Sequence, residues 1–226
     1  MVVFYEADKE AFHVKRKNLL EYLQEENAKM GKERLIAFTD AVLAIIMTIL
    51  VLELKKPSEM TLDAFWALRA SFFSYLLSFF WIGSSWITMN RLWEHVKRIN
   101  RKVAWWNLLF LFALSFMPYA TGIVSSNFNN ALAQAVYGIV VIATSICSLI
   151  SYKVLDAPNS DSSILLEETK KYRKILLIDI IIKCIALVLA VTVYPQCMMY
   201  GVLTAAGYLQ IAKLVIQRPK KNAQQV

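Results

Sequence analysis

The sequence predicts an all-α integral membrane protein with six transmembrane helices per subunit and both termini in the cytoplasm. Hydrophobic residues make up 58% of the 226 residues, whereas soluble domains contain about 45–50% of them. The apolar residues fall into blocks of about twenty, which is the length that a helix needs to cross a bilayer. Lys and Arg gather in alternate connections between these blocks, as the positive-inside rule describes.

The chain divides into three parts. Residues 1–31 are polar with apolar residues at helical spacing, and they predict an amphipathic cytoplasmic extension. A solvated extension and a membrane-surface or regulatory segment are both compatible with this pattern. A six-span domain over residues 32–218 follows, and residues 219–226 form a basic tail. The spans are expected at about 33–54, 65–93, 103–124, 131–152, 174–194 and 198–217.

Local signals bound these spans. The first span stops at Lys55-Lys56-Pro57, because proline terminates a helix well. Trp105 and Trp106 open the third span at a position that suits a membrane interface. The sequence between the fourth and fifth spans, residues 153–173, is hydrophilic and is expected to be a loop with an amphipathic approach to the fifth span.

The loop charges predict the orientation. Seven Lys and Arg lie in residues 1–34, five in the second connection counted from Arg91, five in residues 153–174 and four from Lys213 onward. The opposite side carries only Lys55, Lys56 and Arg69. The positive-inside rule then places both termini and the even-numbered connections in the cytoplasm, in a multi-pass protein of the cell membrane.

Composition and motifs exclude several functional classes. In a membrane protein, a net charge of +8 reflects cytoplasmic loops facing anionic lipid, so nucleic acid is not an expected partner. The chain lacks HExxH, GxSxG, Walker and Cys-x-x-Cys motifs, so no enzyme activity is expected. Cys147, Cys184 and Cys197 show no metal-ligand spacing, and neither a metal site nor a cofactor is predicted.

Charged residues inside the predicted spans are candidates for function, because a charge in lipid is costly. Asp40 lies about two turns into the first span and should face protein or water, either as a structural hydrogen-bond hub or as a proton carrier. Arg34 lies six residues before it, so the two do not meet along one helix face. Asp179 and Lys183 are spaced i, i+4 in the fifth span, which allows a self-neutralising pair or part of an ion pathway.

One stripe of the first span has the spacing of a single helix face. It is mostly apolar with one hydroxyl layer. Two interpretations stay open: ordinary packing against neighbouring helices, or a pore wall in which an aliphatic ring excludes water. The stripe consists of Arg34, Phe38, Ala41, Ile45, Thr48 and Leu52.

The motif Arg34-x-x-x-Phe38-Thr39-Asp40 resembles the signature Arg-x-x-x-Phe-Ser-Asp of the lysosomal/endosomal potassium channel family, and especially of its six-span prokaryotic members. The continuation AVLAIIMTILVLELKKP is similar to the rest of that family's first span. The segment from Trp86 to Trp93 is similar to the polar end of its second span.

This resemblance implies a homotetrameric potassium channel whose pore is lined by the first span of each subunit. Ile45 would form the hydrophobic constriction, Thr48 the polar layer associated with cation selection, and Leu52, with Ala41 of the same stripe, further lining. Arg34, Phe38, Thr39 and Asp40 would hold the first span against its neighbours, with Trp86 and Asn90 as partners. The permeant ion would be K⁺ or another monovalent cation, with the lipid bilayer as surroundings.

The chain departs from the family pattern at two places. Thr39 replaces the motif serine, and Met89 and Asn90 replace histidines usual near the end of the second span. The chain also lacks a TVGYG filter, so selectivity would need another device.

The hypothesis is a passive, potassium-permeable channel. The main alternative is a proton-coupled secondary transporter that uses Asp40 or the Asp179/Lys183 pair. A further alternative is a structural membrane protein whose apolar stripes only pack.

Overall fold

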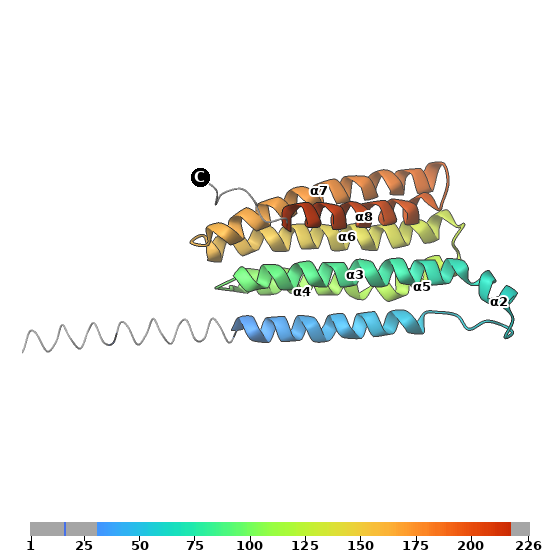
Figure 1. Ribbon diagram of the computed structural model, residues 1–226, viewed down its shortest axis with the longest axis horizontal. Coiled ribbons are helices and arrows are strands. Elements are labelled where there is room, and N and C mark those ends of the chain that lie inside the picture. The colour runs from blue at the N-terminus through green and yellow to red at the C-terminus, as the bar shows by residue number, and fades with distance from the viewer. Residues whose placement is uncertain (1–15, 17–30, 218–226) are drawn as a thin grey trace, which may run out of the picture.

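The computed structural model describes residue 16 and residues 31–217, and these residues are helical apart from turns and short connections (Figure 1). The expected basic tail and nearly all of the expected N-terminal extension lie outside the described residues. The first helix covers Gly31–Leu52. It is followed by α2 (Leu62–Ala67), α3 (Arg69–His95), α4 (Arg101–Ser115), α5 (Met117–Ser126), α6 (Ala131–Asp156), the 3₁₀ turn η1 (Ala157–Asn159), α7 (Ser163–Thr192) and α8 (Cys197–Gln217).

Four helices begin at a polar side chain that accepts hydrogen bonds from the otherwise unpaired N–H groups of the first turn. Thr61 caps α2 and Asn100 caps α4, each through the N–H three residues on. Asn130 caps α6 by accepting from two backbone N–H groups. Ser162 caps α7 at Leu165. Helix starts are therefore set locally by residue type.

The second and third predicted spans are each broken in the structure. Leu68 separates α2 from α3, so the span expected at 65–93 begins instead at Arg69, and residues 65–67 belong to the short α2. The third span is divided at Phe116 into α4 and α5. Pro118, in the first turn of α5, causes this break because it has no N–H to donate to the preceding turn.

The expected loop at 153–173 is mostly helix, and that prediction was wrong. The fourth span continues as α6 to Asp156, and α7 starts at Ser163. Side-chain contacts stabilise these polar turns: Asp156 accepts a hydrogen bond of 2.6 Å from the hydroxyl of Thr169 and forms an ion pair with Arg173. The hydrophilic residues therefore belong mostly to the paired ends of α6 and α7, and only residues 157–162 connect the two helices.

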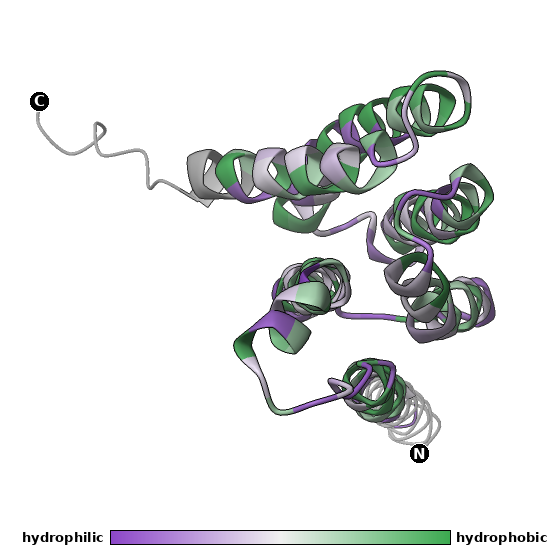
Figure 2. Cartoon of the chain, turned by 90° about the vertical axis from the view of Figure 1, so that its right-hand side faces the viewer, coloured by the Kyte–Doolittle hydropathy of each residue, from purple (hydrophilic) through white to green (hydrophobic). Residues whose placement is uncertain are grey.

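The long helices run roughly side by side (Figure 1), with α6 packed against α4, α5 and α7, α7 against α8, and α3 against α5. The end-on view shows the first helix at one margin of the bundle, with a largely hydrophobic surface (Figure 2). Five helical stretches among the described residues are long and apolar enough to cross a bilayer. The apolar part of α8, Cys197–Ala212, is shorter. The chain is a multi-pass, all-helical membrane protein.

Helices α7 and α8 pack at close range through small residues. A Cβ atom added to Gly201 would overlap the side chain of Ala186. Small residues let helix backbones approach in membranes, where dispersion contacts replace the hydrophobic effect as the main attraction. Gly201 therefore belongs to the permanent interface between α7 and α8.

Candidate functional site

The first helix has two faces of opposite character. Thr39, Leu43, Ile46 and Leu50 are buried against the rest of the bundle, with Leu50 completely inaccessible. The residues of the predicted pore stripe all lie on the exposed side, where Ile45 is 58% and Leu52 79% exposed. Residues 31–217 therefore pack against one stripe of this helix and leave the other stripe uncovered.

Asp40 contacts α3 through the side chain of Trp86. The indole Nε1–H donates a hydrogen bond of 2.8 Å to Oδ1 of Asp40. The bond joins residues 46 positions apart and links a carboxylate to a neutral donor. Charge-assisted bonds of this kind are stronger than neutral ones. The structure thus satisfies Asp40 between helices and does not pair it with Arg34.

Thr39 connects the first helix to α4. Its hydroxyl donates to the carbonyl of Leu35 at 2.7 Å and accepts from Nδ2 of Asn107, also at 2.7 Å. Both residues are buried. Sequence reasoning assigned no role to Asn107, although an amide inside the apolar run WWNLLFLF is a signal that could have identified it. Such a group needs a partner, because an unpaired amide in an apolar setting is costly.

Other residues of the predicted network are not brought together. Arg34 and Phe38 are exposed, and among the described residues neither forms a hydrogen bond or ion pair. Within that same part of the chain, Asn90 forms no side-chain hydrogen bond. Instead, Lys32 donates from Nζ to the carbonyl of Val96 at 2.7 Å, which fixes the start of the described helix to the connection between α3 and α4.

Thr48 has a defined hydroxyl orientation. Its Oγ1 donates to the carbonyl of Ile45 at 2.8 Å, within the same helix. The hydroxyl proton is thereby directed along the helix, and the oxygen lone pairs remain available to accept. Because Thr48 is exposed, its oxygen presents a partial negative charge on the same uncovered face as Ile45.

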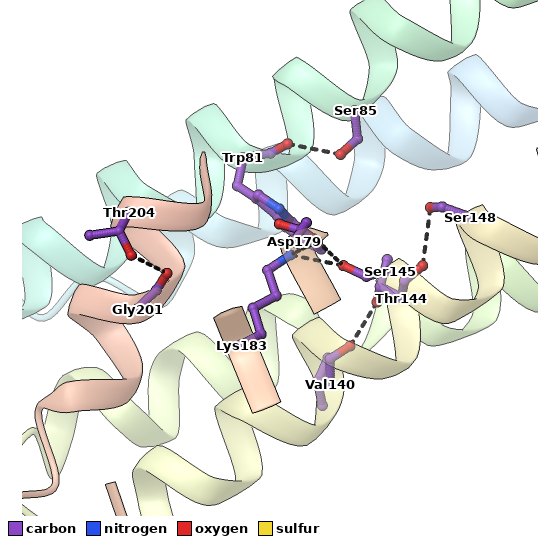
Figure 3. A network of polar contacts seen from close by, with 10 residues as sticks. All are labelled: Trp81, Ser85, Val140, Thr144, Ser145, Ser148, Asp179, Lys183, Gly201 and Thr204. Atoms are coloured by element: carbon purple, nitrogen blue, oxygen red, sulfur yellow. Dashed lines mark hydrogen bonds and ion pairs between the residues drawn. The ribbon is translucent and has the colours of Figure 1, made fainter. Parts of the chain in front are cut away.

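A second polar site lies inside the bundle, between α3, α6 and α7 (Figure 3). Lys183 and Asp179 are both completely buried, and the Lys183 Nζ lies 2.6 Å from Oδ2 of Asp179. Lys183 also donates to the hydroxyl of Ser145 at 2.8 Å, and Ser145 donates to Oδ2 of Asp179 at 3.0 Å. The ammonium lies 4.8 Å from the centre of the Trp81 ring.

This network neutralises itself inside the protein. The three polar residues form a closed triangle, and the aromatic face of Trp81 adds a favourable contact for the ammonium. One oxygen, Oδ1 of Asp179, is buried without a hydrogen-bond partner among the described residues. None of the four residues belongs to the first helix. The described residues contain no group of His, Cys, Asp and Glu side chains that could hold a metal ion.

Residues 34–118 match the family model described as the endosomal/lysosomal potassium channel TMEM175. A protein of Chryseobacterium sp. (strain P1-3), named as a potassium channel, is 39% identical over 127 residues, which cover 56% of this chain and 64% of that protein. A potassium channel of Streptomyces collinus is 32% identical over 118 residues, covering 49% of this chain and 57% of that protein. A Danio rerio protein named as the endosomal/lysosomal proton channel TMEM175 is 25% identical over 111 residues, 47% of this chain and 21% of that protein.

The fold is similar to a solved structure, described as the crystal structure of a lysosomal potassium-selective channel TMEM175 homolog from Chamaesiphon minutus. The TM-score is 0.63 and the identity 21%, over 81% of this chain and 98% of that chain. The chain spans less than two thirds of the length of the bacterial relatives that it matches. These findings confirm the resemblance predicted from the sequence, because both the matching family model and the bacterial relatives are named as potassium channels.

Proposed function

We propose that this protein is a passive, potassium-permeable cation channel of the cell membrane, formed by four copies of the chain. Ions pass along the axis between the four first helices. In this proposal α8 provides a sixth crossing, and both termini lie in the cytoplasm. The names of the relatives as potassium channels support the permeant ion.

The observation that carries the proposal is the uncovered stripe of the first helix. The other side of the first helix is held by hydrogen bonds from two other helices, from Trp86 of α3 to Asp40 and from Asn107 of α4 to Thr39. These bonds fix the rotation of the helix about its axis. The exposed face can therefore meet the same face of three further subunits in a defined register.

The chemistry of this face suits a gated pore. Ile45 forms the narrowest layer, because a ring of four aliphatic side chains excludes water and blocks ions when it is narrow. Thr48 follows one turn later and offers a hydroxyl oxygen whose proton is already donated to the helix backbone. Leu52 and Ala41 extend the lining on either side. Arg34 and Phe38 are exposed at one end of the stripe and contact neighbouring subunits.

Replacing Ile45 with asparagine tests the pore assignment. Ile45→Asn should hydrate the constriction and raise potassium flux, measured in proteoliposomes under a potassium gradient. Ile181 of α7 provides a matched control, because it is 57% exposed and outside the proposed pore. Ile181→Asn should leave the flux unchanged. Equal effects of the two substitutions, or a lower flux for Ile45→Asn, would show that the first helix does not line the pathway.

A second candidate is proton conduction or proton-coupled transport, because the vertebrate relatives are named as proton channels. Asp40 and the buried Asp179–Lys183 pair are the candidates for proton exchange within the described membrane-spanning helices. The two functions differ in the gradient that sets the reversal potential. A current that reverses with the potassium gradient at symmetrical pH supports the channel, whereas reversal that follows only the pH gradient supports proton transport.

A further inference from the structure

An apolar groove runs between α3 and α8 on the surface of the bundle. Its hollow has a volume of about 290 Å³. The α3 wall extends from Phe73 to Ser84 and the α8 wall from Leu203 to Gln210. With a rise of about 1.5 Å per residue, the α3 wall is about 16 Å long, which is close to half of the roughly 30 Å hydrocarbon thickness of a bilayer.

The groove continues at one end into a wider hollow of about 710 Å³ beside α2. The two hollows share Phe73 and Leu76. The wider one is lined by one acidic and one basic side chain, Asp63 and Arg69. The guanidinium carbon of the exposed Arg69 lies 5.7 Å from the centre of the Trp66 ring, and its Nη1 donates to the carbonyl of Trp66. The apolar groove is thus about as long as one leaflet is thick, and it ends at the guanidinium of Arg69 beside the exposed Trp66.

Gly207 forms part of the α8 wall, and its surroundings differ from those of Gly201. A Cβ atom added to Gly207 would meet nothing within 4 Å. Glycine in a helix interior is unfavourable relative to alanine, and at Gly201 close packing against α7 explains it. At Gly207 no described residue packs so closely, and the missing side chain leaves the α8 wall of the groove open.

We propose that this groove binds one acyl chain of a membrane phospholipid, and that Arg69 binds the phosphate of the same lipid. A guanidinium recognises phosphate oxygens through paired N–H groups. Aromatic residues such as Trp66 are typical of the level of lipid headgroups. A hollow of about 290 Å³ has room for part of a hydrocarbon chain. The site is separate from the proposed pore stripe and does not depend on ion conduction.

Photo-crosslinking in proteoliposomes tests this site. The full chain is reconstituted with phosphatidylglycerol that carries a diazirine on one acyl chain, and the labelled peptides are mapped by mass spectrometry. Labelling should concentrate on the two groove walls, residues 72–84 and 203–210. Gly207→Phe fills the groove and should reduce labelling there about tenfold, as should Arg69→Gln, which removes one charge-assisted contact.

Two matched substitutions serve as controls. Thr204→Phe adds the same ring at an exposed position of α8 outside the groove, and Lys55→Gln removes an exposed cation from the connection between the first helix and α2. Both should keep the wild-type labelling. Labelling of the exposed face of α7 by bulk lipid gives an internal reference that shows whether each variant is folded and reconstituted.

Unchanged groove labelling in Gly207→Phe, with normal labelling of α7, would overturn the proposal. Equal labelling of the groove and the α7 face in the wild type would also overturn it. If Gly207→Phe is not folded by the reference criterion, Gly207→Leu replaces it with the same expected result. Dissociation of the oligomer by either variant, without a change in lipid labelling per chain, would instead identify the groove as a contact between subunits.

Discussion

Trp86 of α3 donates its indole N–H to the carboxylate of Asp40 across the interface with the first helix, at 2.8 Å. The bond joins Asp40, the last residue of the sequence motif in the first helix, to Trp86 at the polar end of the second predicted span. The bond gives this carboxylate a hydrogen-bond donor inside the membrane, where an unpaired charge is costly. It also fixes which side of the first helix faces α3.

We predict that Trp86→Phe destabilises the protein by about 1–2 kcal/mol, because Asp40 loses its donor while the aromatic packing is largely kept. The measurement is the free energy of unfolding in mixed micelles. Trp105→Phe provides the control, since Trp105 is an exposed tryptophan of α4. A loss in Trp105→Phe as large as that in Trp86→Phe would show that removal of the indole itself, and not the bond to Asp40, causes the effect.

The bond between Asn107 and Thr39 predicts a graded series. Thr39→Ser keeps the hydroxyl and should change the free energy of unfolding by less than about 1 kcal/mol, whereas Thr39→Val leaves the buried amide of Asn107 unpaired and should cost about 1–3 kcal/mol. Asn107→Leu combined with Thr39→Val removes both polar groups and should recover part of that loss. If serine and valine proved equivalent at this position, the hydrogen bond would contribute nothing measurable.

The buried pair of α7 predicts strong non-additivity. Lys183→Met leaves the carboxylate of Asp179 uncompensated and should destabilise by about 3–5 kcal/mol, or prevent insertion. The double variant Asp179→Leu with Lys183→Met removes both charges and should be closer to the wild type than either single variant. Additive losses would mean that the two residues do not act as a pair. If the double variant also conducts potassium normally, the pair is structural.

Thr48→Ala is expected to lower the preference for potassium over sodium, because the proposed polar layer loses its hydroxyl oxygens. The measurement is the reversal potential under bi-ionic conditions with purified protein in planar bilayers. Thr204→Ala, which removes a similarly bonded and exposed hydroxyl from α8, is the matched control. An unchanged reversal potential in Thr48→Ala would remove this residue from the selectivity mechanism.

Two glycines of α8 should respond in opposite directions to the same substitution. Gly201→Ala should reduce stability by about 1–3 kcal/mol, because the added methyl group overlaps Ala186 and forces α7 and α8 apart. Gly207→Ala should raise stability by up to about 1 kcal/mol, because alanine favours helix and meets open space. Similar changes in the two variants would contradict the difference in packing.

Much of the fold follows from one-dimensional features of the chain. Apolar blocks with polar ends predict long helices, and the described part of the chain has five that are long and apolar enough to cross a bilayer. The internal boundaries do not follow in this way. The break at Phe116 depends on Pro118 directly after it, and the helical course of residues 153–156 and 163–173 depends on contacts between α6 and α7 such as Asp156 with Thr169.

In the candidate site, too, some features could be predicted from the sequence and others could not. Residue spacing alone placed Phe38, Ala41, Ile45, Thr48 and Leu52 on one helix face, because helix periodicity is a local property. Spacing also made the Asp179–Lys183 pair possible. Periodicity contains no information about which face the rest of the bundle covers, so the sequence left packing and pore lining as open interpretations.

The tertiary structure decided which face is covered and which partners the polar groups have. Trp86 meets Asp40 over 46 residues and Asn107 meets Thr39 over 68, and such pairs depend on how helices rotate and slide against each other. The same applies to Arg34 and Asn90, which the motif grouped with Asp40 and the structure leaves apart. By itself, the sequence predicted the membrane-spanning helices and the resemblance to a channel family, because apolar length and a short motif are local. Only three-dimensional packing fixed the exposed stripe, the buried charge network and the groove, because each is formed by side chains from different helices.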